Sequence, residues 1–107
     1  MQNENSYNQF YEECRSLYNT IFVAKIDKLL ELLFSQKEFS MLIGYSVDIL
    51  KIYPGSVNVY AWRIAAFKKQ GQMDLVRNTM EVAKNIFDEA ELEMLEEKLE
   101  SILSAIK

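Results

Sequence analysis

The sequence contains no histidine and a single cysteine, Cys14. Histidine is the most common general base and metal ligand, and thiolate clusters and zinc sites need several cysteines. A glycine-rich phosphate loop and a nucleophile elbow are absent as well. These absences predict a protein that is not an enzyme and that holds no cofactor and no metal ion.

Neither a signal peptide nor a long apolar run is present in the 107 residues. A membrane-spanning helix needs about 18 or more consecutive apolar residues, and one cysteine excludes a disulfide within the chain. We therefore expect a cytoplasmic protein. Because Cys14 lies at helical spacing among apolar residues, we expect its side chain to be buried as a small hydrophobic group rather than to act as a reactive thiol.

Basic residues are scarce relative to acidic ones, and the formal net charge is −4. From Asp88 onward there are seven acids and two lysines, whereas residues 1–87 hold nine acids and ten bases. The only basic cluster is Lys68–Lys69, which falls short of the electrostatic footprint that direct binding of nucleic acid requires. The net acidity, with few basic residues beside the apolar positions, also argues against a protein that binds a membrane surface.

Four glutamates near the C-terminus share one helical face, because they are spaced i, i+3, i+4 and i+7. Carboxylates in this arrangement could hold a divalent ion, but metal sites in helical bundles usually add histidines from several helices. A solvated helix face is therefore the preferred interpretation. The four residues are Glu93, Glu96, Glu97 and Glu100.

With one proline and three glycines, the chain has few helix breakers. Apolar residues follow the helical period from Tyr7 to Leu33 without interruption, which predicts one long first helix, although a break near Asn19–Thr20 stays open. The polar residues 1–5 are expected to be disordered or frayed. Four further helices are expected at about 38–53, 57–70, 73–87 and 89–106.

Most of these helices begin beside a residue whose side-chain oxygen can accept a hydrogen bond from a free backbone N–H group. Three such residues are followed three positions later by Glu or Gln, which is the capping-box pattern. The three pairs are Ser6 with Gln9, Ser35 with Glu38, and Asp88 with Glu91, and Ser56 precedes the third helix.

Proline and glycine mark the ends of two helices. Pro54 and Gly55 end the second helix, because proline cannot continue the hydrogen-bond ladder. Gly71 follows the third helix, where a left-handed residue is wanted. Gly44 lies inside the second helix, and we expect close approach of a neighbouring backbone there.

Apolar residues recur at a spacing of 34 residues, the length of one helix–turn–helix unit of the tetratricopeptide kind. Such a unit buries its apolar face only against a neighbour. The spacing predicts an all-α, right-handed stack of antiparallel helix pairs in one domain over 6–107, with repeats at about 23–56 and 57–90 and a capping helix at about 89–106. The matched pairs are Ile26 and Tyr60, Leu30 and Ile64, Leu33 and Phe67, Phe39 and Met73, Leu42 and Val76, Ile49 and Ala83, Ile52 and Ile86, and Tyr53 and Phe87.

Both units resemble the tetratricopeptide pattern of W-x2-L-G-x2-Y, then A-x3-F, then P. In the second unit, Tyr60 takes the place of the Trp and Phe67 that of the Tyr. The chain thus looks like a degenerate member of this superfamily. The remaining matches are Gly71 and Ala83 in the second unit and Leu29, Leu33 and Pro54 in the first.

The run from Phe10 to Ile102 is also similar to the bacterial transcriptional activator domain, which follows a DNA-binding winged helix in antibiotic-regulatory and related response-regulator proteins. The similarity rests on the tyrosine-rich first helix, the Ile52-Tyr53-Pro54 helix end, the Tyr60 to Gly71 helix and the acidic segment 89–99. The resemblance implies a non-catalytic protein–protein interaction module, the signalling or dimerisation domain of a transcription regulator whose DNA-binding part lies outside this chain.

Trp62 lies beside the inward-facing stripe of the third helix, where it either covers an edge between helices or anchors a partner. In a regular stack, the concave face would bind the protein or peptide partner. Lys68 and Lys69 would suit an acidic group there, although solvation beside Gly71 is the simpler role for this pair. The other members of the face would be Asp27, Glu31, Asn58, Ala61 and Ala65.

Two alternatives stay open at this point. One is a stand-alone tetratricopeptide-like adaptor or chaperone that binds a short peptide in the concave groove. The other concerns assembly, because two repeats are fewer than an independent stack usually needs. Either the long first helix and the acidic last helix cap the stack, or a second copy of the chain supplies the missing face, so a homodimer is a further expectation.

Overall fold

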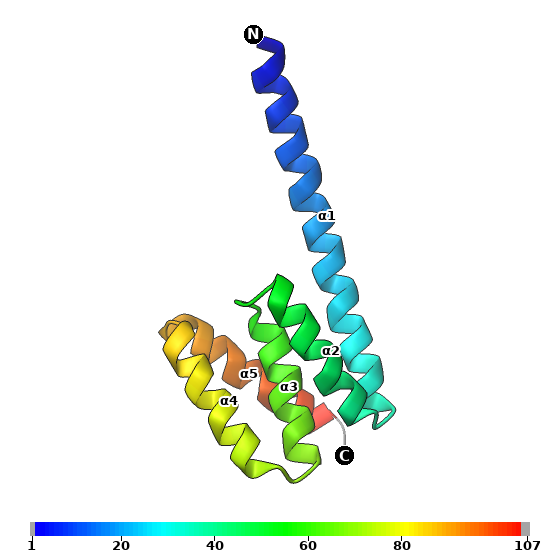
Figure 1. Ribbon diagram of the computed structural model, residues 1–107, viewed down its shortest axis with the longest axis vertical. Helices are drawn as coiled ribbons and strands as arrows, with labels where there is room; N and C mark the ends of the chain where they lie inside the picture. The colour runs from blue at the N-terminus through cyan, green and yellow to red at the C-terminus, as the bar shows by residue number, and fades with distance from the viewer. Residues whose placement is uncertain (1, 106–107) are drawn as a thin grey trace.

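The structure is a computed structural model that describes residues 2–105, apart from the side chains of residues 2–8, 10, 11, 18 and 19. Within residues 2–105 it contains five helices and no strand, which confirms the expected all-α class with about five helices. The right-handed stack stays a prediction. The helices are α1 (Gln2–Ser35), α2 (Phe39–Ile52), α3 (Val57–Lys69), α4 (Met73–Ile86) and α5 (Glu89–Ala105) (Figure 1).

The first helix, α1, begins at Gln2, four residues before the predicted capping box at Ser6. Residues 2–5, for which the sequence predicted a disordered or frayed start, are therefore helical, and Met1 lies outside the described residues. The helix is also continuous through Asn19–Thr20. No glycine or proline interrupts this segment, and the Thr20 hydroxyl donates to the Ser16 carbonyl within the helix (2.9 Å).

The turns that follow α1 and α3 are closed by the same backbone hydrogen bonds, 34 residues apart. Each turn combines a bond to the third residue back with a bond to the fifth residue back, which is how a left-handed residue ends a helix. The predicted repeat spacing is therefore present in the backbone at these two turns. The N–H donors and carbonyl acceptors are Lys37 to Phe34 and Glu38 to Leu33 after α1, and Gly71 to Lys68 and Gln72 to Phe67 after α3.

The predicted capping box of Ser35 and Glu38 is wrong. Ser35 is the last residue of α1, and its hydroxyl donates to the Glu31 carbonyl (2.8 Å). Glu38 is the N-cap of α2 but makes no side-chain capping bond. The left-handed turn at Lys37 keeps Ser35 in the preceding helix, so that it is out of position to cap α2.

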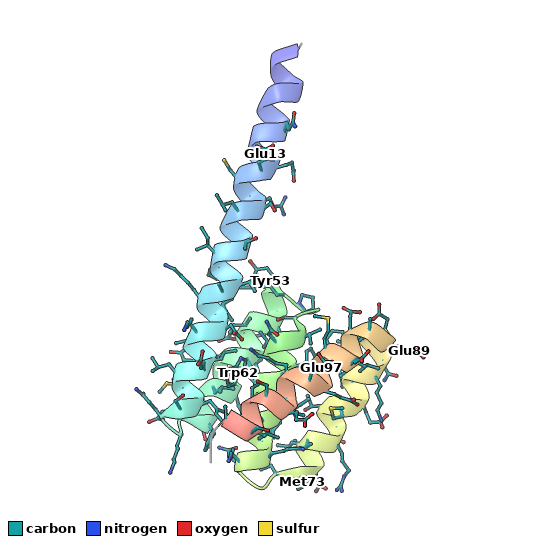
Figure 2. All side chains as sticks on the ribbon, turned by 180° about the vertical axis from the view of Figure 1, so that it is seen from behind. Glu13, Tyr53, Trp62, Met73, Glu89 and Glu97 are labelled. Atoms are coloured by element: carbon teal, nitrogen blue, oxygen red, sulfur yellow. The ribbon has the colours of Figure 1, made fainter. Side chains whose placement is uncertain are left out.

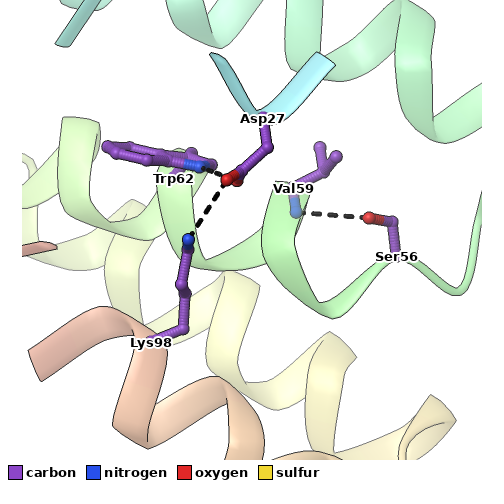
Figure 3. Close-up of polar contacts among 5 residues, drawn as sticks. All are labelled: Asp27, Ser56, Val59, Trp62 and Lys98. Atoms are coloured by element: carbon purple, nitrogen blue, oxygen red, sulfur yellow. Dashed lines mark hydrogen bonds and ion pairs between the residues drawn. The ribbon is translucent and has the colours of Figure 1, made fainter. Parts of the chain in front are cut away.

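Two other predicted caps are confirmed. The Val59 N–H donates to the Ser56 hydroxyl (3.3 Å) at the start of α3 (Figure 3). At the start of α5, the Glu91 N–H donates to the Asp88 carboxylate (2.8 Å) and the Asp88 N–H donates to the Glu91 carboxylate (3.2 Å). This reciprocal pair satisfies two N–H groups that a helix start leaves free.

The central helix is α3, which packs against all four other helices. Its residues from Val59 to Phe67 are buried, apart from the half-buried Arg63. The last helix, α5, crosses α3 obliquely on the face that Figure 2 turns toward the viewer. Four completely buried residues, one from each of four helices, mark the core: Leu30, Leu42, Ile64 and Leu95.

The N-terminal part of α1 projects away from this body and gives the molecule extents of 59 × 30 × 22 Å (Figure 1). Every described side chain between residues 9 and 25 is exposed, and Ile26 is the first to be partly buried. We call residues 2–25 of α1 the stalk.

The expectation for Gly44 is wrong as well. A Cβ atom placed on this residue would meet nothing within 4 Å. Gly44 is exposed on α2, so no neighbouring backbone requires a glycine there.

None of the helices that the structure describes has the length and apolar character needed to cross a membrane.

Candidate interaction surface

The stalk exposes the large apolar side chains of Leu17 and Ile21. Leu17 is 64% exposed and Ile21 is 50% exposed. Cys14 is exposed too, so the prediction that it is buried is wrong. Its helical spacing among apolar residues was a correct observation, but the stalk extends beyond the body and nothing in the described part of the chain covers it.

Cys14 and Ile21 of the stalk lie on the opposite side of α1 from the core residue Leu30. At about 100° per residue, Cys14 and Leu30 are about 160° apart around the helix axis, and Ile21 and Leu30 are about 180° apart. Leu30 is completely buried against the body. The apolar side of the stalk therefore faces away from the core and is open to another molecule.

The stalk meets the body beside an apolar groove between α1 and α2. The groove has a volume of about 280 Å³ and is lined by residues that include Phe22, Lys25 and Leu29 of α1. The rings of Phe22 and Tyr53 lie 6.0 Å apart at its edge. A second cavity of about 440 Å³ lies on the other side of Ile26, between α1, the end of α2 and Val59 of α3.

The face that the sequence predicted to be concave is not accessible. Ala61 and Ala65 have no exposed surface, and Trp62 is only 4% exposed. These residues are enclosed because α3 is surrounded by the other helices and α5 crosses it. They cannot contact a partner in this conformation. The sequence did contain a signal, since alanines at 61, 65 and 66 are small enough to let a second helix approach closely.

Trp62 joins three helices through Asp27 and Lys98. Its indole Nε1–H donates to the Asp27 carboxylate (2.7 Å), and the Lys98 ammonium lies 3.3 Å from the other carboxylate oxygen (Figure 3). The Lys98 ammonium also lies 5.4 Å from the centre of the Trp62 ring, within range of a cation–π contact. Trp62 therefore covers an edge between helices, and Asp27 holds α1, α3 and α5 together instead of facing a partner.

The remaining residues of the predicted face are scattered. Lys68 and Lys69 are exposed in the last turn of α3, where positive charge interacts favourably with the helix dipole. Glu31 is exposed on α1, and Asn58 is half-buried beside the larger cavity. The structure brings Asp27, Asn58 and Trp62 together at the larger cavity, whereas Glu31, Lys68 and Lys69 are exposed elsewhere.

A buried polar contact between α2 and α3 was missed in the sequence. The Arg63 guanidinium donates to the completely buried Ser46 hydroxyl (2.9 Å), and it lies 5.0 Å from the centre of the Phe67 ring. Burial lowers the pKa of Arg63 from its usual value, while Tyr60 raises it to a smaller extent. The signal was an arginine inside the apolar run from Val59 to Phe67.

The described residues contain no group of three or more His, Cys, Asp or Glu side chains that could hold a metal ion. Comparison with protein-family models, with curated proteins and with solved structures gives no match. The structure by itself therefore establishes the class of this protein, which is an all-α protein of five helices. Its most unusual surface is the projecting stalk with its exposed apolar side.

Proposed function

We propose that this chain is a non-catalytic protein–protein interaction module that binds its partner through the stalk. The observation that carries the proposal is the exposure of Leu17 and Ile21 on a helix that projects from the body. Aliphatic side chains at such a place are stabilised when a partner removes them from water, by about 25 cal/mol for each Å² buried.

Helix stability supports the same proposal. Most helical stability in proteins comes from packing of an apolar face rather than from the helix propensity of the sequence. The stalk also contains residues that form helices poorly, among them Asn3, Asn5, Asn8 and Asn19. Docking of the stalk against a partner would supply the packing that the body does not provide.

The resemblance to the bacterial transcriptional activator domain suggests the wider role. We propose the signalling or dimerisation domain of a cytoplasmic bacterial transcription regulator whose DNA-binding part lies outside this chain. The net charge of −4 and the isolation of Lys68–Lys69 as the only basic cluster support a domain that does not itself contact DNA.

The second candidate is a stand-alone tetratricopeptide-like adaptor or chaperone. The cavity of about 440 Å³ beside Val59 favours it, since an apolar side chain of a short peptide would fit there. The complete burial of Ala61 and Ala65 counts against a peptide in the groove that this candidate was expected to use. Binding lost on charge reversal of Lys68 and Lys69 would favour this candidate.

Photo-crosslinking from defined stalk positions tests the proposal. A photoreactive residue at Leu17 should give crosslinked products in the cells that make the protein, because position 17 lies on the apolar side. The matched control is Ser16, which is also exposed but lies about 160° from Cys14 around the helix. Equal yields from 16 and 17, or no product from 17, would contradict a stalk interface.

A further inference from the structure

We propose that the occupant of the stalk is a second copy of this chain, paired antiparallel to the first about a two-fold axis that passes beside Cys14. This inference rests on the proposed function and names the partner. The observation behind it is the spacing of apolar residues along the stalk, together with the free side of α1 on which the described members lie.

The apolar positions of the stalk form a symmetric pattern. They are 7, 10, 11, 14, 17, 18 and 21, and reversing their order about position 14 returns the same seven positions. An antiparallel pair centred on Cys14 therefore sets position 7 of one copy at the level of 21 of the other, and 11 at the level of 17. A two-fold interface must be self-complementary in this way, since each copy offers the same patch.

The size of this surface suits a dimer. Four of the seven positions are aromatic by sequence: Tyr7, Phe10, Tyr11 and Tyr18. At about 150 Å² for each buried aromatic side chain, four per copy give on the order of 1,200 Å² for the pair, the lower end of the range for specific interfaces. Leu17 and Ile21 add to this, and both are half or more exposed in the single chain.

Part of the apolar side of α1 stays exposed beyond the stalk. The completely buried Leu30 lies about 160–180° around the helix from Cys14 and Ile21, and the buried Leu33 lies about 100° from Cys14. Further along the apolar side, Leu32 is exposed as well, at 53%. At the junction, the groove that Lys25 and Leu29 line borders this side, so the end of a second stalk would lie next to α2 there.

Charge selects the antiparallel orientation over the parallel one. Lys25 is exposed and lies about 20° around the helix from Cys14, close to the middle of the same side. In a parallel, in-register pair the two Lys25 residues would face each other across the axis and repel. In the antiparallel pair, position 25 of one copy is at the level of position 3 of the other, one residue from Glu4. Lys25 and Glu4 carry opposite charges and are on the same side of the interface, so they would attract each other.

Oxidation of Cys14 tests the centre of the interface. Helices packed 8–10 Å apart with Cα radii of about 2.3 Å leave facing Cα atoms roughly 5 Å apart, which a disulfide can span. We expect mild oxidation to convert most of the chain into a disulfide-linked dimer. The Leu17→Lys, Ile21→Lys double variant should lose at least tenfold in the initial rate, and the Ser16→Lys variant should keep the full rate.

Two single-cysteine variants in a Cys14→Ser background test the orientation. In the antiparallel pair, Tyr7→Cys of one copy lies opposite Ile21→Cys of the other, whereas two copies of residue 7 are about 21 Å apart along the axis. A mixture of the two variants should crosslink rapidly and Tyr7→Cys alone should not. Rapid crosslinking of Tyr7→Cys alone would overturn the antiparallel arrangement.

The outcomes separate this inference from the proposed function. Products from photoreactive position 17 that have the mass of two chains support the second copy as the occupant. Products that contain a different protein, with no Cys14 dimer in the purified chain, would overturn the second copy but leave the stalk as an interaction surface. The absence of any product from position 17 would overturn both.

Discussion

Lys37 and Gly71 adopt the same left-handed backbone conformation, with φ angles of 62° and 72°, at positions 34 residues apart. Each residue ends the first helix of a helix pair, and the hydrogen bonds around it are the same. Both positions of the repeat therefore require a left-handed backbone conformation. Glycine adopts this conformation without strain, whereas lysine carries a Cβ that crowds the following carbonyl oxygen.

Exchanging these two residue types should shift stability in opposite directions. We expect Lys37→Gly to raise the free energy of unfolding by about 1 kcal/mol, and Gly71→Ala to lower it by about 1 kcal/mol, because a left-handed residue other than glycine costs roughly that much. No atom lies within 4 Å of a Cβ on Gly71, so the backbone strain is the only cost. Chemical denaturation measures both changes.

Lys37→Ala is the control for this pair. Alanine carries a Cβ atom as lysine does, so the strain at position 37 stays and stability should change little. A stabilisation by alanine as large as that by glycine would show that loss of the lysine side chain, and not relief of the backbone, is the cause.

Gly44→Ala should stabilise the protein. Gly44 lies inside α2 with free space around it, so the added methyl group meets no atom. Alanine is favoured over glycine in a helix interior by about 1 kcal/mol. Thermal unfolding followed by circular dichroism should show a higher Tm for the variant. A lower Tm would mean that a backbone approaches Gly44 closely after all.

Removal of Asp27 should weaken the contact between α1, α3 and α5. In Asp27→Ala, the buried Trp62 Nε1–H loses its acceptor, and an unpaired buried donor costs about 1–3 kcal/mol of unfolding free energy. Asp27→Asn keeps an acceptor oxygen for the indole and should cost less. Trp62 is the only tryptophan, so its fluorescence emission reports this site alone.

Lys98→Met separates the hydrogen bond from the ion pair. Lys98 is partly exposed, so solvent screens its ion pair with Asp27, and pairs of this kind contribute up to about 1 kcal/mol. We expect Lys98→Met to destabilise the protein less than Asp27→Ala does. A larger loss from Lys98→Met would show that the lysine, and not the indole hydrogen bond, joins the helices.

The sequence predicted the number of helices, most of their ends and the 34-residue spacing, because these depend on local chemistry. Ser56 and the Asp88–Glu91 pair cap their helices as expected, and Gly71 takes the left-handed conformation. The path of α5 could not be predicted in this way. The sequence predicted a capping helix at about 89–106 but not that this helix crosses α3, and the prediction therefore placed Ala61 and Ala65 on an open face.

The burial of residues along the stalk could not be predicted from the sequence either. The apolar period of α1 continues from the stalk into the body, and the sequence does not show where the body ends. The sequence therefore predicted a buried Cys14. In the structure Cys14 is exposed, and the first partly buried side chain of α1 is that of Ile26. The apolar side changes from the free face at Ile21 to the core at Leu30, which lies about 180° away around the helix.

The mass of the purified chain as a function of concentration tests the central claim most directly. One chain has a mass of 12.5 kDa. Light scattering should give twice this mass at high concentration for the natural chain and for Ser16→Lys, and 12.5 kDa at every concentration for the Leu17→Lys, Ile21→Lys double variant. A mass of 12.5 kDa for all three proteins at millimolar concentration, or a dimer that survives both lysines, would contradict pairing through the stalk.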